Sequence, residues 1–183
     1  MSHFLSYTVV YGTDGMKYGL KVLTTSYRIY LMRLVLLRPN VLATARQSFL
    51  HPGSPDSQAS NSETQTPLVS SLRKELSNIC IRAAISVIST FHTNLKSPYR
   101  LLGSSAVFVT LSAATVIIAA SLVKELGVDL EGEGNIEVIT QAFAILDGHM
   151  WHVEGARGAK ELLQSFLKTV KRENKRRRNN GEF

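Results

Sequence analysis

The sequence predicts an all-α fold of five to six helices in a helical array or bundle, and three observations lead to that prediction. Apolar residues recur every three or four positions through most of the chain, which is the period of an amphipathic helix. Pro67 and Pro98 each follow a Thr or a Ser, a pair that is typical of a helix start. Residues 101–123 carry no charge, as a helix buried on every side requires. With 183 residues, 44% of them hydrophobic, the chain can form one core.

The first helix is predicted over residues 16–38. Pro39 has no backbone N–H and disfavours the α conformation of Arg38, so we expect the helix to end or kink there. A shorter helix is expected to follow as far as Phe49. Residues 1–15 are an unassigned lead. The apolar face of the first helix is expected to consist of Leu20, Leu23, Tyr27, Tyr30, Leu31, Leu34 and Leu37.

A second long helix is predicted to start with Thr66 as its N-cap and Pro67 as its first residue. It follows a polar loop, residues 51–66, that has no apolar period and is expected to be flexible. Cys80 is the only cysteine of the chain, which excludes an intrachain disulfide and a cysteine zinc site, so we expect it to be a small buried hydrophobic residue. The core-facing stripe of this helix is expected to contain Leu68, Leu72, Leu76, Ile79, Cys80, Ala83, Ala84, Val87, Ile88 and Phe91.

The uncharged segment 101–123 is expected to follow Ser97 as N-cap and to end near Gly127 as C-cap. Its length and lack of charge also suit a single membrane span, which is the alternative interpretation of the whole chain. Its many small and hydroxylated residues are compatible with packing in either setting. We favour the centre of a soluble bundle, because the neighbouring segments are amphipathic.

Two more helices are predicted beyond an acidic, glycine-rich turn. Asn135 is expected to cap the first of them and Gly148 to interrupt it. The last helix is predicted over residues 153–175, and residues 176–183 are expected to form a basic disordered tail. The inward side chains are expected to be Ile136, Ile139, Phe143 and Leu146 in the first helix, and Ala156, Ala159, Leu163, Phe166 and Val170 in the second.

No group of residues forms a convincing active-site motif, so we expect no enzyme and assign no catalytic or cofactor-binding residue. The best candidate for a metal site is Asp147 with His149 and His152, which offers one carboxylate and two imidazoles. Gly148 weakens the helix that would align them, and no fourth ligand is specified. We therefore predict no metal site, and favour a helix-end junction with Trp151 packed and both histidines half exposed.

Basic residues concentrate at the two ends of the chain. Residues 1–50 carry six Lys or Arg against one Asp, residues 51–167 carry eight against eleven acidic residues, and residues 168–183 carry seven against two. The basic tail contains Lys171, Arg172, Lys175, Arg176, Arg177 and Arg178. Three interpretations of it stay open: a nuclear-import signal, a contact with nucleic acid or acidic lipid, and a solvated helix end whose cations suit the helix dipole.

The segment Cys80-Ile81-Arg82-Ala83-Ala84 resembles the Cys-x-x-Ala-Ala helix of the fungal-specific regulatory (middle homology) domain in fungal zinc-cluster transcription factors. That family pairs this helix with an earlier one that ends in an Arg-Pro step, which is Arg38-Pro39 here. The polar gap at 51–66, the order of the later helices and the position of Trp151 resemble the family as well. The resemblance covers roughly residues 20–175.

This resemblance implies a regulatory helical domain over residues 16–175, located in the nucleus and acting in transcription regulation through protein partners, either the transcription machinery or full-length relatives. Family members bind two zinc ions through six cysteines in a separate cluster. That cluster is absent here, so the resemblance implies no cofactor in this chain and no direct sequence-specific DNA binding. The preference for a buried helix at 101–123 over a membrane span is what makes us expect no membrane partner. Only the later part of the helical region is expected, a partial domain. We therefore expect an exposed apolar patch above about 400 Å² on the first helix near residues 27–37.

Overall fold

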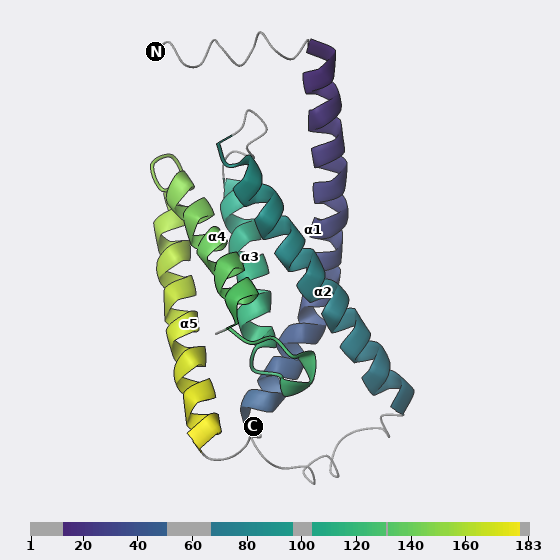
Figure 1. Ribbon diagram of the computed structural model, residues 1–183, viewed down its shortest axis with the longest axis vertical. Helices are drawn as coiled ribbons and strands as arrows, with labels where there is room; N and C mark the ends of the chain where they lie inside the picture. Colours follow the sequence, from purple (N-terminus) through teal and green to yellow (C-terminus); the bar gives the residue numbers. More distant parts are fainter. Residues whose placement is uncertain (1–12, 51–66, 97–103, 131, 180–183) are drawn as a thin grey trace.

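The computed structural model describes residues 13–50, 67–96, 104–130 and 132–179, and within these ranges it contains helices and no strand. The α-helices are α1 (Thr13–Leu50), α2 (Pro67–Asn94), α3 (Ser104–Ala120), α4 (Glu133–His149) and α5 (Gly155–Asn179), with a short 3₁₀ turn, η2 (Lys124–Leu126), between α3 and α4. Figure 1 shows α5 and the upper part of α1 on opposite sides of the array, while the lower part of α1 passes beneath the other helices. The predicted all-α fold is confirmed.

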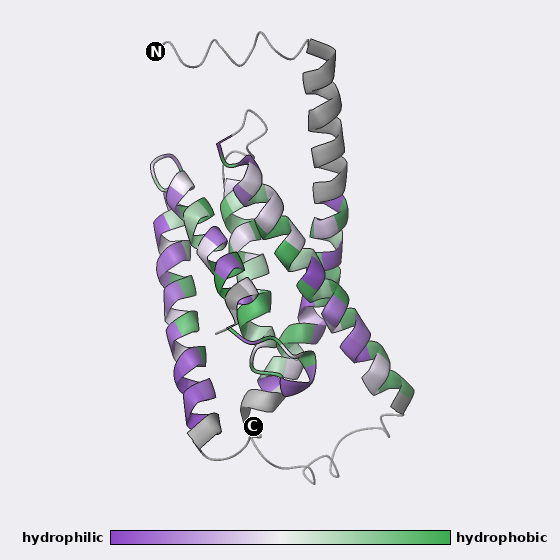
Figure 2. Ribbon diagram, viewed as in Figure 1, coloured by the Kyte–Doolittle hydropathy of each residue, from purple (hydrophilic) through white to green (hydrophobic). Residues whose placement is uncertain are grey.

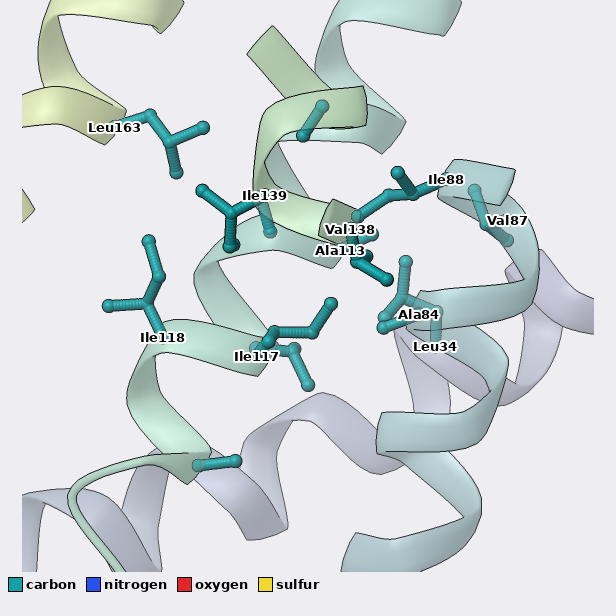
Figure 3. Close-up of a cluster of buried hydrophobic side chains, with 14 of the residues drawn as sticks. Leu34, Ala84, Val87, Ile88, Ala113, Ile117, Ile118, Val138, Ile139 and Leu163 are labelled. Carbon is teal, nitrogen blue, oxygen red and sulfur yellow. The ribbon is translucent and has the colours of Figure 1, made fainter. Parts of the chain in front are cut away.

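The centre of the array is α3, which packs against α1, α2, α4 and α5. Eleven of its 17 residues are buried, and none of them is charged, so neighbours can pack around most of its circumference. Figure 3 shows Ile117 and Ala113 of this helix beside Leu34 of α1 and Ala84 of α2. In the ranges that the structure describes, no helix is both long enough and apolar enough to cross a membrane.

The end of α3 differs from the prediction. The helix stops at Ala120 rather than continuing to residue 123, and the chain then forms η2. Gly127 caps η2 with a left-handed φ of 62°, and its N–H bonds to the carbonyl of Lys124. The predicted cap residue is therefore right, but it ends a single 3₁₀ turn instead of the long helix. The expected N-cap, Ser97, lies outside the described residues.

At Pro39 the helix α1 bends but does not end. Pro39 lies inside α1, which continues to Leu50, so the separate short helix predicted after it is wrong. Proline cannot donate to the carbonyl four residues earlier, and its ring crowds that carbonyl, which bends a helix that tertiary packing holds together. In Figure 1 the axis of α1 changes direction in its lower part. The packing on the far side of the proline comes from Val41 and Ala45, which are both buried.

The second helix starts at Pro67, as predicted, but its first turns leave the core. Cys80, Ala83, Ala84, Val87, Ile88 and Phe91 are buried, whereas Leu68 and Leu72 are exposed. Figure 1 shows the reason: α1 and α2 cross, and the first turns of α2 extend beyond the other helices. The apolar stripe is thus longer than the surface available to cover it. The expected loop at 51–66 and its cap residue Thr66 lie outside the described residues.

The start of α4 also corrects the prediction. Gly132 is the N-cap and α4 begins at Glu133, so Asn135 lies inside the first turn. Its side-chain Nδ2 donates to the carbonyl of Asp129 at 2.9 Å, which secures the preceding turn. The buried face shifts accordingly: Ile139 and Leu146 are buried as predicted, together with Val138, Ala142 and Ile145, while Phe143 is half-buried and Ile136 is exposed.

Gly148 continues α4 to His149 rather than interrupting it. A Cβ atom at this position would lie 3.1 Å from Cδ1 of Leu95, so glycine allows the turn after α2 to approach α4 closely. In α5, four of the five predicted inward residues are buried, namely Ala156, Ala159, Leu163 and Val170. Phe166 is 40% exposed, which contradicts the prediction. The helix reaches Asn179, so residues 176–179 are helical and not a disordered tail.

Candidate functional site

The two motifs that carry the family resemblance meet in the core. The thiol of Cys80 points at the backbone carbonyl of Leu34, with 3.9 Å between Sγ and the oxygen. Leu34 is on α1, one turn before Arg38-Pro39, and both Cys80 and Leu34 are buried. The small side chains of Ala83 and Ala84 are buried on the same stretch of α2, where small residues let helices approach closely. The Arg-Pro helix and the Cys-x-x-Ala-Ala helix are therefore packed against each other.

Burial makes the Cys80 thiol a poor nucleophile. Desolvation raises its pKa to about 11 from the usual 9.0, and the nearby positive charge of Arg38 offsets only part of that rise. The neutral thiol therefore dominates at physiological pH, and it is the thiolate that reacts. The prediction that Cys80 is a small buried hydrophobic residue is confirmed.

Arg38 links α1 to the central helix. Its Nη1 donates to the hydroxyl oxygen of Ser112 on α3, across 3.5 Å. Ser112 is buried and Arg38 is half-buried, so the bond lies at the edge of the core. The Arg-Pro step thus does two things: the proline bends α1, and the arginine attaches the bent helix to α3.

The histidine cluster does not assemble as a metal site. The Asp147 carboxylate is bound by the Lys160 ammonium at 2.6 Å, which commits it to α5. The rings of His149 and His152 meet edge to face, with 4.9 Å between their centroids. Across the part of the chain that the structure describes, no three His, Cys, Asp or Glu side chains are grouped so as to hold a metal.

The details of this junction differ from the favoured interpretation. Trp151 is 76% exposed rather than packed, and the centroid of its ring lies 4.3 Å from the centroid of the His152 ring. His149 is 1% exposed rather than half exposed, while His152 is on the surface. The sequence signal for this difference is the spacing: His149 follows Ile145 and Leu146 on the buried face of α4, whereas Trp151 and His152 lie beyond the helix end.

Large apolar side chains are exposed on α1 where the sequence suggested an apolar patch. They are Ile29, Met32, Val35 and Leu36, all within or next to the turns that precede the bend. Leu68, Val69 and Leu72 at the start of α2 are exposed too. Exposed apolar side chains gathered on one element are typical of surfaces that bind other proteins.

A second apolar surface lies between α3 and α5 and was not predicted. A hollow of about 330 Å³ is lined by Thr115, Ile118, Ala119, Leu122, Ser165, Phe166, Thr169 and Val170. Sequence reasoning missed it because α3 is apolar all round, so its pattern does not show which face stays open. Phe108, two turns before Thr115, is 60% exposed on the same helix.

The basic residues of the tail extend α5 as a charged ridge. Lys171, Arg172, Lys175 and Arg176 are exposed on the helix, and Figure 2 shows α5 as the most hydrophilic helix of the array along its outer side. Arg177 and Arg178 belong to the helix too, but their side chains lie outside the described residues. Cations in the last turns of a helix are favourable, because the carbonyl end of the helix dipole is negative.

Comparison with known proteins gives no match: no family model, no curated protein and no solved structure is similar to this chain. The resemblance to the fungal regulatory domain therefore depends on the residues of the α1–α2 pair and on the order of the elements that follow.

Proposed function

We propose that this chain is a non-enzymatic regulatory domain that acts in transcription regulation in the nucleus by binding other proteins. The observation that carries the proposal is the packing of the Cys80 helix on the Arg38-Pro39 helix, because this pair is the core of the resemblance. The Cys80 Sγ to Leu34 oxygen distance of 3.9 Å places the two motifs in direct contact.

The exposed apolar side chains on α1 and α2 support a role in binding. A chain that keeps Met32, Leu36 and Leu68 in water gains free energy when a partner covers them, at roughly 25 cal/mol per Å² of apolar area buried. Partners of the proposed kind are components of the transcription machinery or full-length relatives that carry a zinc cluster. This chain would reach specific DNA sequences through such a partner.

The basic ridge of α5 supports nuclear location. Short runs of exposed Lys and Arg are the usual features of import signals, and Lys171, Arg172, Lys175 and Arg176 meet that description. The ridge projects from the C-terminal half of α5, so an import receptor can bind it without disturbing the core.

Two measurements test the proposal. The full chain fused to a fluorescent protein should accumulate in the nucleus, and replacing the six basic residues of the tail by Gln should abolish that accumulation. The chain tethered to a heterologous DNA-binding domain should change reporter transcription at least threefold in either direction, whereas a Leu34→Asp variant should not, because a buried carboxylate would disrupt the α1–α2 pair. A wild-type fusion that enters the nucleus and leaves the reporter unchanged would contradict the regulatory role.

A further inference from the structure

One stripe of the central helix is left without a neighbour. α3 contacts four other helices, and in Figure 1 the upper part of α1 lies on the opposite side of the array from α5. Phe108, Leu111, Thr115 and Ala119 recur every three or four residues, so they share one face of α3. Phe108 is 60% exposed, and the other three are half-buried. Two of its residues, Thr115 and Ala119, line the hollow between α3 and α5, and we call the stripe and this hollow together the groove.

The walls of the groove are apolar as well. On the α5 side, Leu162 and Phe166 are exposed, and Phe166 lines the hollow together with Ser165 and Thr169. On the α1 side, Val35 is exposed and lies one turn before Arg38, whose guanidinium bonds to Ser112 of α3. The floor from Phe108 to Ala119 is about 17 Å long, which matches three turns of a helix.

The rim of the groove is positively charged. Arg172 and Arg176 follow Thr169 by three and seven residues, which places them on the groove side of α5. All charged side chains of α1 between residues 28 and 46 are arginines. Glu173 follows Thr169 by four residues, so it lies on the same side of α5, but it is half-buried and the two exposed arginines outnumber it. A second copy of the chain would bring a helix of the same charge to this rim, which disfavours self-association there.

We infer that this groove binds an amphipathic helix of a partner protein, with apolar side chains on the buried face and acidic side chains along its flanks. The inference rests on the proposed role in partner binding and adds the surface and the chemistry of the partner. Apolar side chains of the partner, spaced at i, i+3 or i+4 and i+7, pack on Phe108 and Phe166. Its carboxylates face Arg172 and Arg176, which sets the orientation and speeds association.

The test uses the full chain and a fluorescent synthetic peptide of sixteen residues, with leucines at i, i+3, i+4 and i+7 and glutamates on both flanks. Fluorescence anisotropy should give saturable binding with a Kd on the order of micromolar. A peptide with lysines in place of the glutamates should bind at least tenfold more weakly. Equal binding of the two peptides would overturn the charge argument.

Variants locate the site. Phe108→Glu and Phe166→Glu should each weaken binding at least tenfold, and circular dichroism checks that they remain folded. If either variant unfolds, Phe166→Ser replaces it, because this side chain is already partly in water. Arg172→Glu with Arg176→Glu should weaken binding at least fivefold. Its matched control is Lys171→Glu with Lys175→Glu, which makes the same charge change about a quarter turn away on the same helix and should alter binding less than twofold.

Several outcomes would overturn the inference. Equal losses from the two charge-reversal pairs would mean non-specific attraction, and unchanged binding in both phenylalanine variants would place the peptide elsewhere. A dimer seen by analytical ultracentrifugation and lost in Phe108→Glu would assign the groove to a second copy. The transcription role is tested separately: peptide binding without a reporter response would contradict the proposed function alone, and a reporter response without peptide binding would contradict this inference alone.

Discussion

Sγ of Cys80 on α2 lies 3.9 Å from the carbonyl oxygen of Leu34 on α1, so a side-chain thiol of one helix meets the backbone of the other. Only a small residue fits beneath a backbone at that distance. The contact limits how far α2 can slide along α1, because a shift of one turn would bring the larger Leu76 to the same carbonyl. It also buries the one thiol of the chain where water does not reach it.

Stability should fall at high pH because of Cys80. The native state raises the pKa of this thiol to about 11 from 9.0, so the folded protein holds the proton more tightly than the unfolded chain does. The stability that comes from keeping this thiol protonated is fully present below pH 9 and is lost as the pH rises from 9 towards 11. We expect a loss on the order of 2 kcal/mol in the free energy of unfolding.

Urea denaturation of the wild type and of Cys80→Ala at pH 8 and pH 10.5 measures this loss. The comparison with Cys80→Ala removes the titration of lysines and tyrosines, which both proteins share. A stability difference between the two proteins that stays constant with pH would contradict the prediction.

The junction of α1, α2 and α3 should depend on Leu34 and not on its exposed neighbour. Leu34 is 1% exposed and Leu36 is 65% exposed, although both belong to the same helix. Leu34→Ala should cost about 2–5 kcal/mol through lost packing and a cavity. Leu36→Ala should stay within about 0.5 kcal/mol. Chemical denaturation measures both variants, and similar losses in the two would mean that the α1 face is assigned incorrectly.

Two helical glycines should respond differently to alanine. Gly158 of α5 has open space around it, so Gly158→Ala should stabilise the protein by about 0.5–1 kcal/mol through the better helix propensity of alanine. At Gly148 the new methyl group would lie 3.1 Å from Cδ1 of Leu95, and that contact should offset the gain. Thermal unfolding compares the two variants. A larger increase in Tm for Gly148→Ala than for Gly158→Ala would show that Leu95, in the turn after α2, is not in close contact with α4.

The Asp147–Lys160 ion pair should contribute little to the free energy of unfolding. Both side chains are partly in water, at 27% and 44% exposure, so solvent screens the pair despite its 2.6 Å distance. We expect Lys160→Met to cost at most about 0.5 kcal/mol at low salt and less at 1 M NaCl. A salt series of denaturation curves provides the measurement. A cost above 2 kcal/mol that persists at high salt would mean that the pair is shielded from water.

Part of the fold can be predicted from local sequence signals, because single residues mark the ends of some elements. Thr-Pro at 66–67 and Gly127 mark chain positions directly, through the missing N–H of proline and the left-handed backbone of glycine. Pro39 misled the prediction of the helix end, since burial of Val41 and Ala45 outweighs the local penalty.

The surfaces that bear on function were harder to predict. Leu68 and Leu72 continue an apolar stripe that no other described helix covers, and the sequence does not show where a neighbouring helix stops. Phe166 fits the apolar period of α5 but lies at the edge that faces the groove. The open face of α3 depends on the angle between α1 and α5, a tertiary property that a uniformly apolar sequence leaves undetermined.

Because its single thiol is buried, labelling of the unmodified protein can report when α1 and α2 separate. A thiol-reactive dye meets only one target in this chain, and that target is covered while α1 and α2 stay together. The labelling rate therefore measures how often this helix pair separates, without any engineered probe. Any ligand that tightens or parts the pair would change that rate, even where the overall helix content stays the same.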